Sequence, residues 1–74
     1  MEDFQTTVLR AVKQLKEADI RAISDLANLP TSVVKGVCGY LTRYGYLAES
    51  QGRYKVVWKG TRALYDKERE IEVK

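Results

Sequence analysis

The sequence predicts a mainly helical α+β fold in a single domain, 1–74, with three core helices, a two-stranded β-hairpin and a C-terminal helix. Three patterns support this prediction. Apolar residues recur at helical spacing over 4–17, and two more helical segments separated by a short turn occupy 19–44. Alternating residues around a polar turn then occupy 46–59, and a last helical segment covers about 61–72.

The first helix is predicted from one apolar stripe. Its members recur at i, i+4, i+7, i+8 and i+11, namely Phe4, Val8, Ala11, Val12 and Leu15. Leu9 falls off this stripe. We expect the stripe to close the core over the next two helices.

The second and third helices are predicted to form a helix-turn-helix. Asp19 offers a carboxylate cap to a short helix over 20–27, in which Ile23, Leu26 and Ala27 share a face. Asn28 tolerates the left-handed conformation that a sharp exit requires, and Leu29 can fold back over the junction. Pro30 then separates the two helices, and Thr31 or Ser32 is expected to cap the next one, which covers about 32–44.

The two faces of helix 32–44 differ in composition. The stripe expected to pack on the core contains Val34, Val37, Cys38 and Leu41. The opposite face contains Ser32, Gly36, Gly39 and Arg43, flanked by Lys35 and Tyr40. Glycine in a helix interior costs about 1 kcal/mol relative to alanine. Either another surface approaches these glycines closely, or packing elsewhere tolerates them.

A β-hairpin is predicted directly after the helix-turn-helix. Gly45 can end the helix with positive φ, 46–49 reads as a strand, 50–52 as a turn and 53–58 as a second strand. In the second strand Tyr54, Val56 and Trp58 alternate with Arg53, Lys55 and Val57, so one face can join the core while the other is basic. Trp58 is expected to pack against the first helix. A helix-turn-helix followed by such a hairpin is a winged helix.

Several stretches resemble winged helix-turn-helix transcription regulators of the MarR and IclR type. They are LPTSVV at 29–34, YLTRYGYL at 40–47 and YKVVWKGTRALY at 54–65. The resemblance covers about 4–70 and implies a DNA-binding regulator whose terminal helices pair two subunits. The sequence departs from the usual pattern at Asn28, where many such turns carry Gly, and at Gly36 and Gly39, where DNA readers usually carry long polar side chains.

Composition argues against an enzyme. Seventy-four residues can build a three-helix core but not an enclosed substrate cavity as well, and the chain has no histidine. The glycines form no phosphate-binding loop, and the carboxylates of the C-terminal segment alternate with Lys and Arg as on a solvated helix. We therefore expect no cofactor and no metal site. The single Cys38 lies on the apolar stripe and is expected to be buried rather than redox-active.

Positive charge is concentrated in the middle of the chain. Residues 30–62 contain six Lys or Arg against one Glu, whereas 1–29 and 63–74 each carry one more acidic than basic residue. The surplus therefore falls on the helix and hairpin that meet DNA in a winged helix, where a helix enters the major groove and the wing follows the adjacent backbone.

The candidate DNA-binding residues follow from this placement: Thr31, Ser32, Lys35, Gly36, Tyr40, Arg43, Arg53 and Lys55. The hydroxyls, at a helix N-terminus, suit a phosphate oxygen. The cations reach bases or phosphates, and each phosphate neutralised makes binding salt-dependent. Tyr40 is expected either on a sugar-phosphate edge or covering the core rim beside Tyr44.

Two classes of function stay open at this stage. The favoured one is a small transcription regulator that binds double-stranded DNA, with or without choosing bases, as a homodimer through its terminal helices or as a monomer with a solvated tail. The alternative is a winged helix that docks a protein through Val33, Gly36 and Gly39. No apolar run is long enough to span a membrane, and the N-terminus does not read as a secretory signal, so we expect a cytoplasmic protein.

Overall fold

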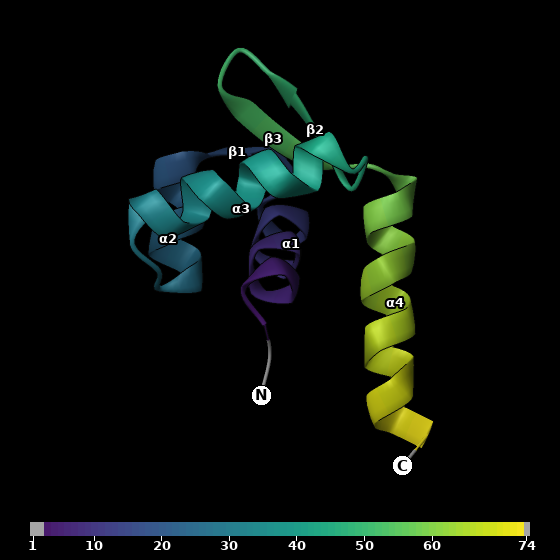
Figure 1. Cartoon of the computed structure of the whole chain (residues 1–74). Coiled ribbons are helices and arrows are strands. Elements are labelled where there is room, and N and C mark those ends of the chain that lie inside the picture. The colour runs from purple at the N-terminus through teal and green to yellow at the C-terminus, as the bar shows by residue number, and fades with distance from the viewer. Residues whose placement is uncertain (1–2, 74) are drawn as a thin grey trace.

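The computed structural model describes residues 3–73, with side chains as far as Asp66. Its elements follow the chain in this order: α1 (Phe4–Leu15), β1 (Ala18–Asp19), α2 (Ile20–Ala27), α3 (Thr31–Arg43), β2 (Leu47–Ser50), β3 (Arg53–Val56) and α4 (Trp58–Val73) (Figure 1). The predicted fold class is confirmed: the three-helix core, the hairpin and the last helix form a winged helix.

Helix α1 is shorter than the predicted range 4–17. Its N-terminus is capped by Asp3, whose Oδ1 accepts the Thr6 backbone N–H at 2.8 Å. At the other end Lys16 adopts φ 72°, which takes the chain out of the helix after Leu15. The early exit lets Ala18 and Asp19 extend alongside β3, and this pairing is the physical reason for the difference.

The burial of α1 partly corrects the predicted stripe. Val8, Ala11 and Val12 are buried as expected. Leu9 is also buried, because α4 packs against its side of α1 and brings the Leu9 Cδ2 atom to 3.2 Å from the Cβ position of Gly60. The two ends of the predicted stripe, Phe4 and Leu15, are instead exposed.

The turn between α2 and α3 forms as predicted. Asp19 caps α2, accepting the Ala22 N–H at 2.9 Å. Asn28 adopts the left-handed conformation, with φ 58° and ψ 47°, and Leu29 folds back so that its N–H donates to the Ser24 carbonyl at 3.2 Å. Leu29 packs against the core cluster. Leu26 differs from the prediction, because its side chain is exposed and only Ile23 of α2 is fully buried.

Helix α3 packs through the predicted stripe. Val34, Cys38 and Leu41 are buried, and Val37 packs beside them half-buried. The prediction that Thr31 or Ser32 caps this helix is wrong, because the cap position is Pro30 and no side chain caps it. The helix begins at Thr31, so both hydroxyls lie within its first turn, past the cap position.

The wing belongs to a three-stranded antiparallel sheet in the order β1-β3-β2. Strand β1, which the sequence did not predict, pairs Ala18 with Tyr54 and Asp19 with Arg53. Strands β2 and β3 are joined at Gln51 and Gly52, both with positive φ (54° and 78°), as in a two-residue type I′ hairpin. The hairpin tip projects beyond the helices (Figure 1).

Helix α4 begins earlier than predicted and changes the role of Trp58. The expected second strand, 53–58, ends at Val56, and Trp58 is the first residue of the helix. Thr61, at the expected start of the last helical segment, therefore lies inside the helix. Trp58 does not pack on α1, because its side chain is 74% exposed. Gly60, in the first turn of this helix, is buried, and a Cβ there would overlap the Tyr46 carbonyl oxygen and lie 2.8 Å from Val56 Cγ1.

Helix α4 extends away from the sheet, and its C-terminal end lies far from the helix-turn-helix (Figure 1). None of the helices in the described part of the chain is long and apolar enough to cross a lipid bilayer.

Candidate nucleic-acid interface

The outer face of α3 is open to solvent along its length. Because Val34, Cys38 and Leu41 turn inward, the 3.6-residue repeat directs the other side of the helix outward. The exposed residues include every candidate that the sequence placed on this helix: Thr31, Ser32, Lys35, Gly36, Tyr40 and Arg43. The helix thus presents hydroxyls at its start and cations at its middle and end.

The two glycines of α3 leave its backbone uncovered. A Cβ built at Gly36 or at Gly39 has no atom within 4 Å beyond the helix itself. Neither glycine is therefore needed for packing within this chain. An approaching surface can reach the α3 backbone more closely here than at any position with a side chain.

Tyr40 lies beside Tyr44, as one of its two expected roles requires, while its contact with DNA stays a prediction. Its ring lies 4.7 Å from the ring of Tyr44, centroid to centroid, with the planes tilted by 45°. It thereby covers the rim of the core beside Tyr44, yet 47% of its surface remains exposed. Tyr40 is positioned by its neighbour and still accessible to a partner.

The wing places its two candidate cations on the outer face of the sheet. Arg53 and Lys55 are exposed, whereas Tyr54 and Val56, which alternate with them on β3, are half-buried and pack against the core. Residues directly opposite in antiparallel strands share a face, so Ser50 of β2 and Asp19 of β1 lie beside Arg53. Arg53 stands on backbone that pairs with both neighbouring strands, whereas Lys55 pairs with Ala48 of β2.

Lys59 has a structural role that the sequence analysis missed. Its Nζ donates to the Tyr44 carbonyl at 2.9 Å and lies 4.7 Å from the centroid of the Tyr46 ring. The carbonyls that end a helix attract cations, and this one comes from 15 residues further along the chain, so no local pattern marks it. Lys59 thus holds the start of α4 against the end of α3. Of the six cations in 30–62, one is committed to the fold.

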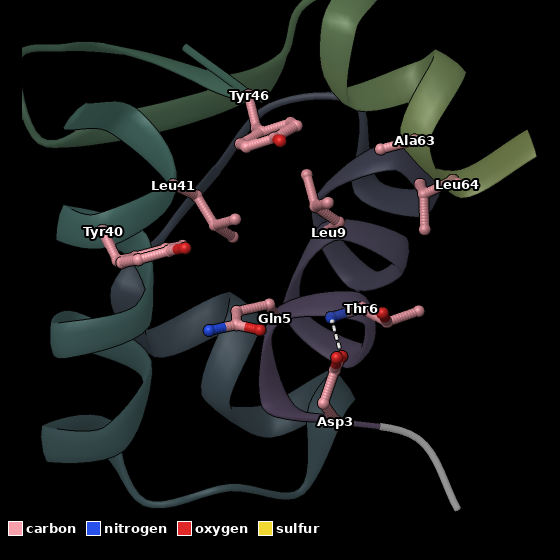
Figure 2. Close-up of a pocket in the computed structure, with 9 residues that line it drawn as sticks. All are labelled: Asp3, Gln5, Thr6, Leu9, Tyr40, Leu41, Tyr46, Ala63 and Leu64. Carbon is pink, nitrogen blue, oxygen red and sulfur yellow. Dashed lines mark hydrogen bonds between the residues drawn. The ribbon is translucent and has the colours of Figure 1, made fainter. Parts of the chain in front are cut away.

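A groove separates the first turn of α1, the last turns of α3, and α4 (Figure 2). This α1–α3–α4 groove has a volume of about 210 Å³. Its lining comes from four segments: Asp3, Gln5, Thr6 and Leu9 from the start of α1, Tyr40 and Leu41 from α3, Tyr46 from the turn after α3, and Ala63 and Leu64 from α4. No local pattern indicates this groove, because residues from 3 to 64 meet there only after folding.

Cys38 is buried on the inner face of α3, and burial raises the pKa of its thiol to about 11. The thiol is therefore protonated and poorly nucleophilic at neutral pH. Burial also raises the pKa of Tyr54, with smaller contributions from Cys38 and Glu49. The described residues contain no group of three or more Cys, Asp or Glu side chains placed to hold a metal ion.

The chain is similar in fold to several solved structures, among them the crystal structure of ligand-free NadR, a MarR-like winged-helix transcriptional regulator. The TM-score is 0.82 and the sequence identity 15%. The match covers 97% of this chain and 56% of the NadR chain, so the chain spans little more than half the length of that protein. No family model and no curated protein matches the sequence. The similarity establishes the winged-helix fold.

Proposed function

We propose that this protein is a small transcriptional regulator that binds double-stranded DNA, with α3 in the major groove and the wing on the adjacent backbone. The observation that carries the proposal is the coincidence of exposed cations with the two elements that a winged helix offers to DNA. Lys35 and Arg43 stand on the outer face of α3, and Arg53 and Lys55 on the outer face of β3. The regulator fold of NadR supports the same reading.

Each part of the α3 face has a distinct role in this proposal. The N-terminal end, with the Thr31 and Ser32 hydroxyls and free backbone N–H groups, binds a phosphate oxygen. Lys35 and Arg43 reach base edges or neighbouring phosphates, and the open backbone at Gly36 lets α3 lie deep in the groove. Tyr40 lies against the sugar-phosphate edge.

We further propose a homodimer through the terminal helices, acting in the cytoplasm and without catalysis. Helix α4 extends beyond the body of the domain, and Tyr65 on its described part is 58% exposed. A two-fold axis near α4 would place two copies of α3 on one face of the duplex, matching a palindromic site.

The second candidate is a protein-docking winged helix. It is favoured by the open backbone at Gly36 and Gly39, beside the half-buried Val33, which makes a smooth strip on α3. A partner helix could pack closely there, and its affinity would depend little on salt because the strip is uncharged.

The test is a fluorescence-anisotropy titration of the full chain onto mixed-sequence duplex DNA at two salt concentrations. We expect binding that weakens steeply with salt, because each phosphate contact releases counterions. An Arg53→Ala/Lys55→Ala variant should bind more weakly and show a salt dependence shallower by about two phosphate contacts.

The matched control is Arg10→Ala/Lys13→Ala on α1, which removes the same charge from a helix outside the proposed interface. It should lower affinity much less than the wing variant. Equal losses in the two variants would indicate general attraction to net charge. No binding at low salt would reject the DNA proposal and favour the protein-docking one.

A further inference from the structure

The last turn of α3 carries two of the residues that we propose to meet DNA. Tyr40 and Arg43 stand there, and the helix ends at its next residue, Tyr44. The final carbonyl groups of a helix have no partner within the helix, so a last turn opens more easily than the middle unless other groups hold it. The placement of Tyr40 and Arg43 therefore depends on how the end of α3 is fixed.

The end of α3 is held by backbone bonds and by one side chain from α4. The Tyr44 N–H donates to the Tyr40 carbonyl at 3.1 Å. The Tyr46 N–H donates to the Leu41 carbonyl at 2.8 Å. The Tyr44 carbonyl instead accepts from the Lys59 ammonium, at 2.9 Å. The last turn is thus fastened in part by a residue that follows it by 15 positions.

The Lys59 side chain is supported along its length. Gly45 leaves room for it, and the Lys59 Cδ atom lies 3.8 Å from the Cβ position of that glycine. The ammonium lies 4.7 Å from the centroid of the Tyr46 ring, within the range of a cation–π contact. The Tyr46 ring is itself packed against the core cluster. Lys59 is therefore directed at the Tyr44 carbonyl by fixed neighbours, unlike a surface lysine that samples many rotamers.

The backbone that carries Lys59 is anchored to the same turn. On one side of Lys59, the Val57 N–H donates to the Tyr46 carbonyl at 3.3 Å. On the other side, Gly60 is buried against that carbonyl. These contacts do not involve the Lys59 side chain, so they remain when the side chain is changed. Because Lys59 is also exposed, its ammonium can be removed without opening a cavity in the core.

We propose that Lys59 is a positioning residue for the DNA-binding face of α3. Through the Tyr44 carbonyl it keeps the last turn of α3 formed in the free protein, so that Tyr40 and Arg43 need not be ordered during binding. Groups that are ordered beforehand bind more tightly, because less conformational entropy is lost in the complex. Lys59 acts without touching DNA. The inference rests on the proposed function and adds a residue of α4 to it.

A positioning role and a direct phosphate contact differ in their salt dependence. A lysine that binds a phosphate releases counterions from the duplex and steepens the fall of affinity with salt. The bond between Lys59 and the Tyr44 carbonyl lies within the protein and releases none. Removing the Lys59 ammonium should therefore lower duplex affinity by the same factor at every salt concentration.

The first measurement is amide hydrogen exchange by NMR on the isotope-labelled full chain without DNA. Lys59→Met keeps an unbranched side chain of similar length but removes the ammonium. The Tyr44 and Gly45 amides should then exchange roughly fivefold faster, while the Cys38 amide in the middle of α3 should be unaffected. Lys59→Arg still donates to the carbonyl and lies over the Tyr46 ring, so it should restore the slow exchange.

The second measurement is duplex affinity of the same proteins by fluorescence anisotropy at several salt concentrations. Lys59→Met should bind roughly fivefold more weakly with an unchanged salt slope, and Lys59→Arg should bind like the unmodified chain. The matched control is Arg62→Met, which removes an exposed positive charge one turn further along α4. It should leave the exchange rates unchanged and alter the affinity by less than about twofold.

Any of three results for Lys59→Met would overturn the inference. Unchanged exchange at Tyr44 and Gly45 would show that Lys59 does not hold the last turn. Faster exchange with unaltered affinity would show that Lys59 serves the fold alone. A salt slope shallower by about one phosphate contact would show that Lys59 touches DNA itself. Failure of the proposed function looks different, because the unmodified chain would then not bind the duplex, and this inference would fall with it.

Discussion

The outer face of α3 and the start of α4 both carry glycine inside a helix, for opposite physical reasons. At Gly60 of α4 the space for a side chain is already taken by the Tyr46 carbonyl and the Val56 side chain. At Gly36 and Gly39 of α3 that space is empty. The same residue type therefore serves the fold in one helix and leaves a surface open in the other. The comparison teaches that a helical glycine acquires meaning only from what surrounds it.

The largest expected effect comes from Gly60→Ala. The new Cβ would collide with backbone at Tyr46, and backbone cannot rotate away as a side-chain end can. We expect the free energy of unfolding to fall by about 3 kcal/mol, the upper part of the range for overpacking. Urea denaturation followed by circular dichroism measures it. A fall in unfolding free energy below about 0.5 kcal/mol would show that α4 can shift to accommodate the methyl group. Gly60 would then be no more constrained than the glycines of α3.

Gly36→Ala and Gly39→Ala should have the opposite sign. Alanine favours the helix by about 1 kcal/mol at each site, and neither new methyl group meets a neighbour. The double variant should therefore be more stable by about 2 kcal/mol in the same urea experiment. Destabilisation would mean that these glycines are packed after all, as in a dimer interface.

The same double variant, Gly36→Ala with Gly39→Ala, tests whether DNA approaches the outer face of α3. If DNA approaches the α3 backbone there, two methyl groups hold it away, and duplex affinity should fall by roughly tenfold, about 1.4 kcal/mol, although the fold is more stable. Anisotropy titrations at low salt measure this change. Unaltered affinity would indicate that the glycines are merely tolerated, and that α3 does not lie deep in the groove.

The smallest expected effect is a pH dependence of stability that arises from Cys38 on the inner face of α3. Burial raises the pKa of its thiol from 9.0 to about 11, so the folded state holds this proton more tightly than the unfolded chain does. The stability that this buried thiol contributes is complete below about pH 9 and is lost as pH rises toward 11. By pH 9.5 the loss in unfolding free energy amounts to about 1 kcal/mol.

A comparison of the unmodified chain with Cys38→Ala from pH 7 to 9.5 isolates this term, because other groups that titrate in this range are common to both. The difference in unfolding free energy between the two proteins should shrink as pH rises. A difference that stays constant would show that the buried thiol ionises as readily as a free one.

Sequence reasoning succeeded where the signal is local. The Asp19 cap, the left-handed Asn28 and the inward stripe of Val34, Cys38 and Leu41 each follow from a residue's own chemistry or from helical spacing, and each is present. The exposed candidates on α3 and β3 lie on the faces that this spacing assigns them. Their contact with DNA stays a prediction.

Sequence reasoning failed for features that depend on contacts between segments far apart in the chain. Strand β1 has only two residues and exists because β3 lies beside it, so no alternation marks it in the sequence. Leu9 is buried where α4 covers α1, and Trp58 is exposed at the start of α4, where Lys59 holds that helix against the end of α3. The groove is missed for the same reason, since its walls meet only in the finished fold.

The pairing of β1 with β3 has a mechanical consequence. Asp19 shares a register position with Arg53 of the wing while its carboxylate caps the first turn of α2. The wing is thus connected through β1 to the start of the helix-turn-helix. A displacement of the hairpin is therefore transmitted through β1 to the first turn of α2.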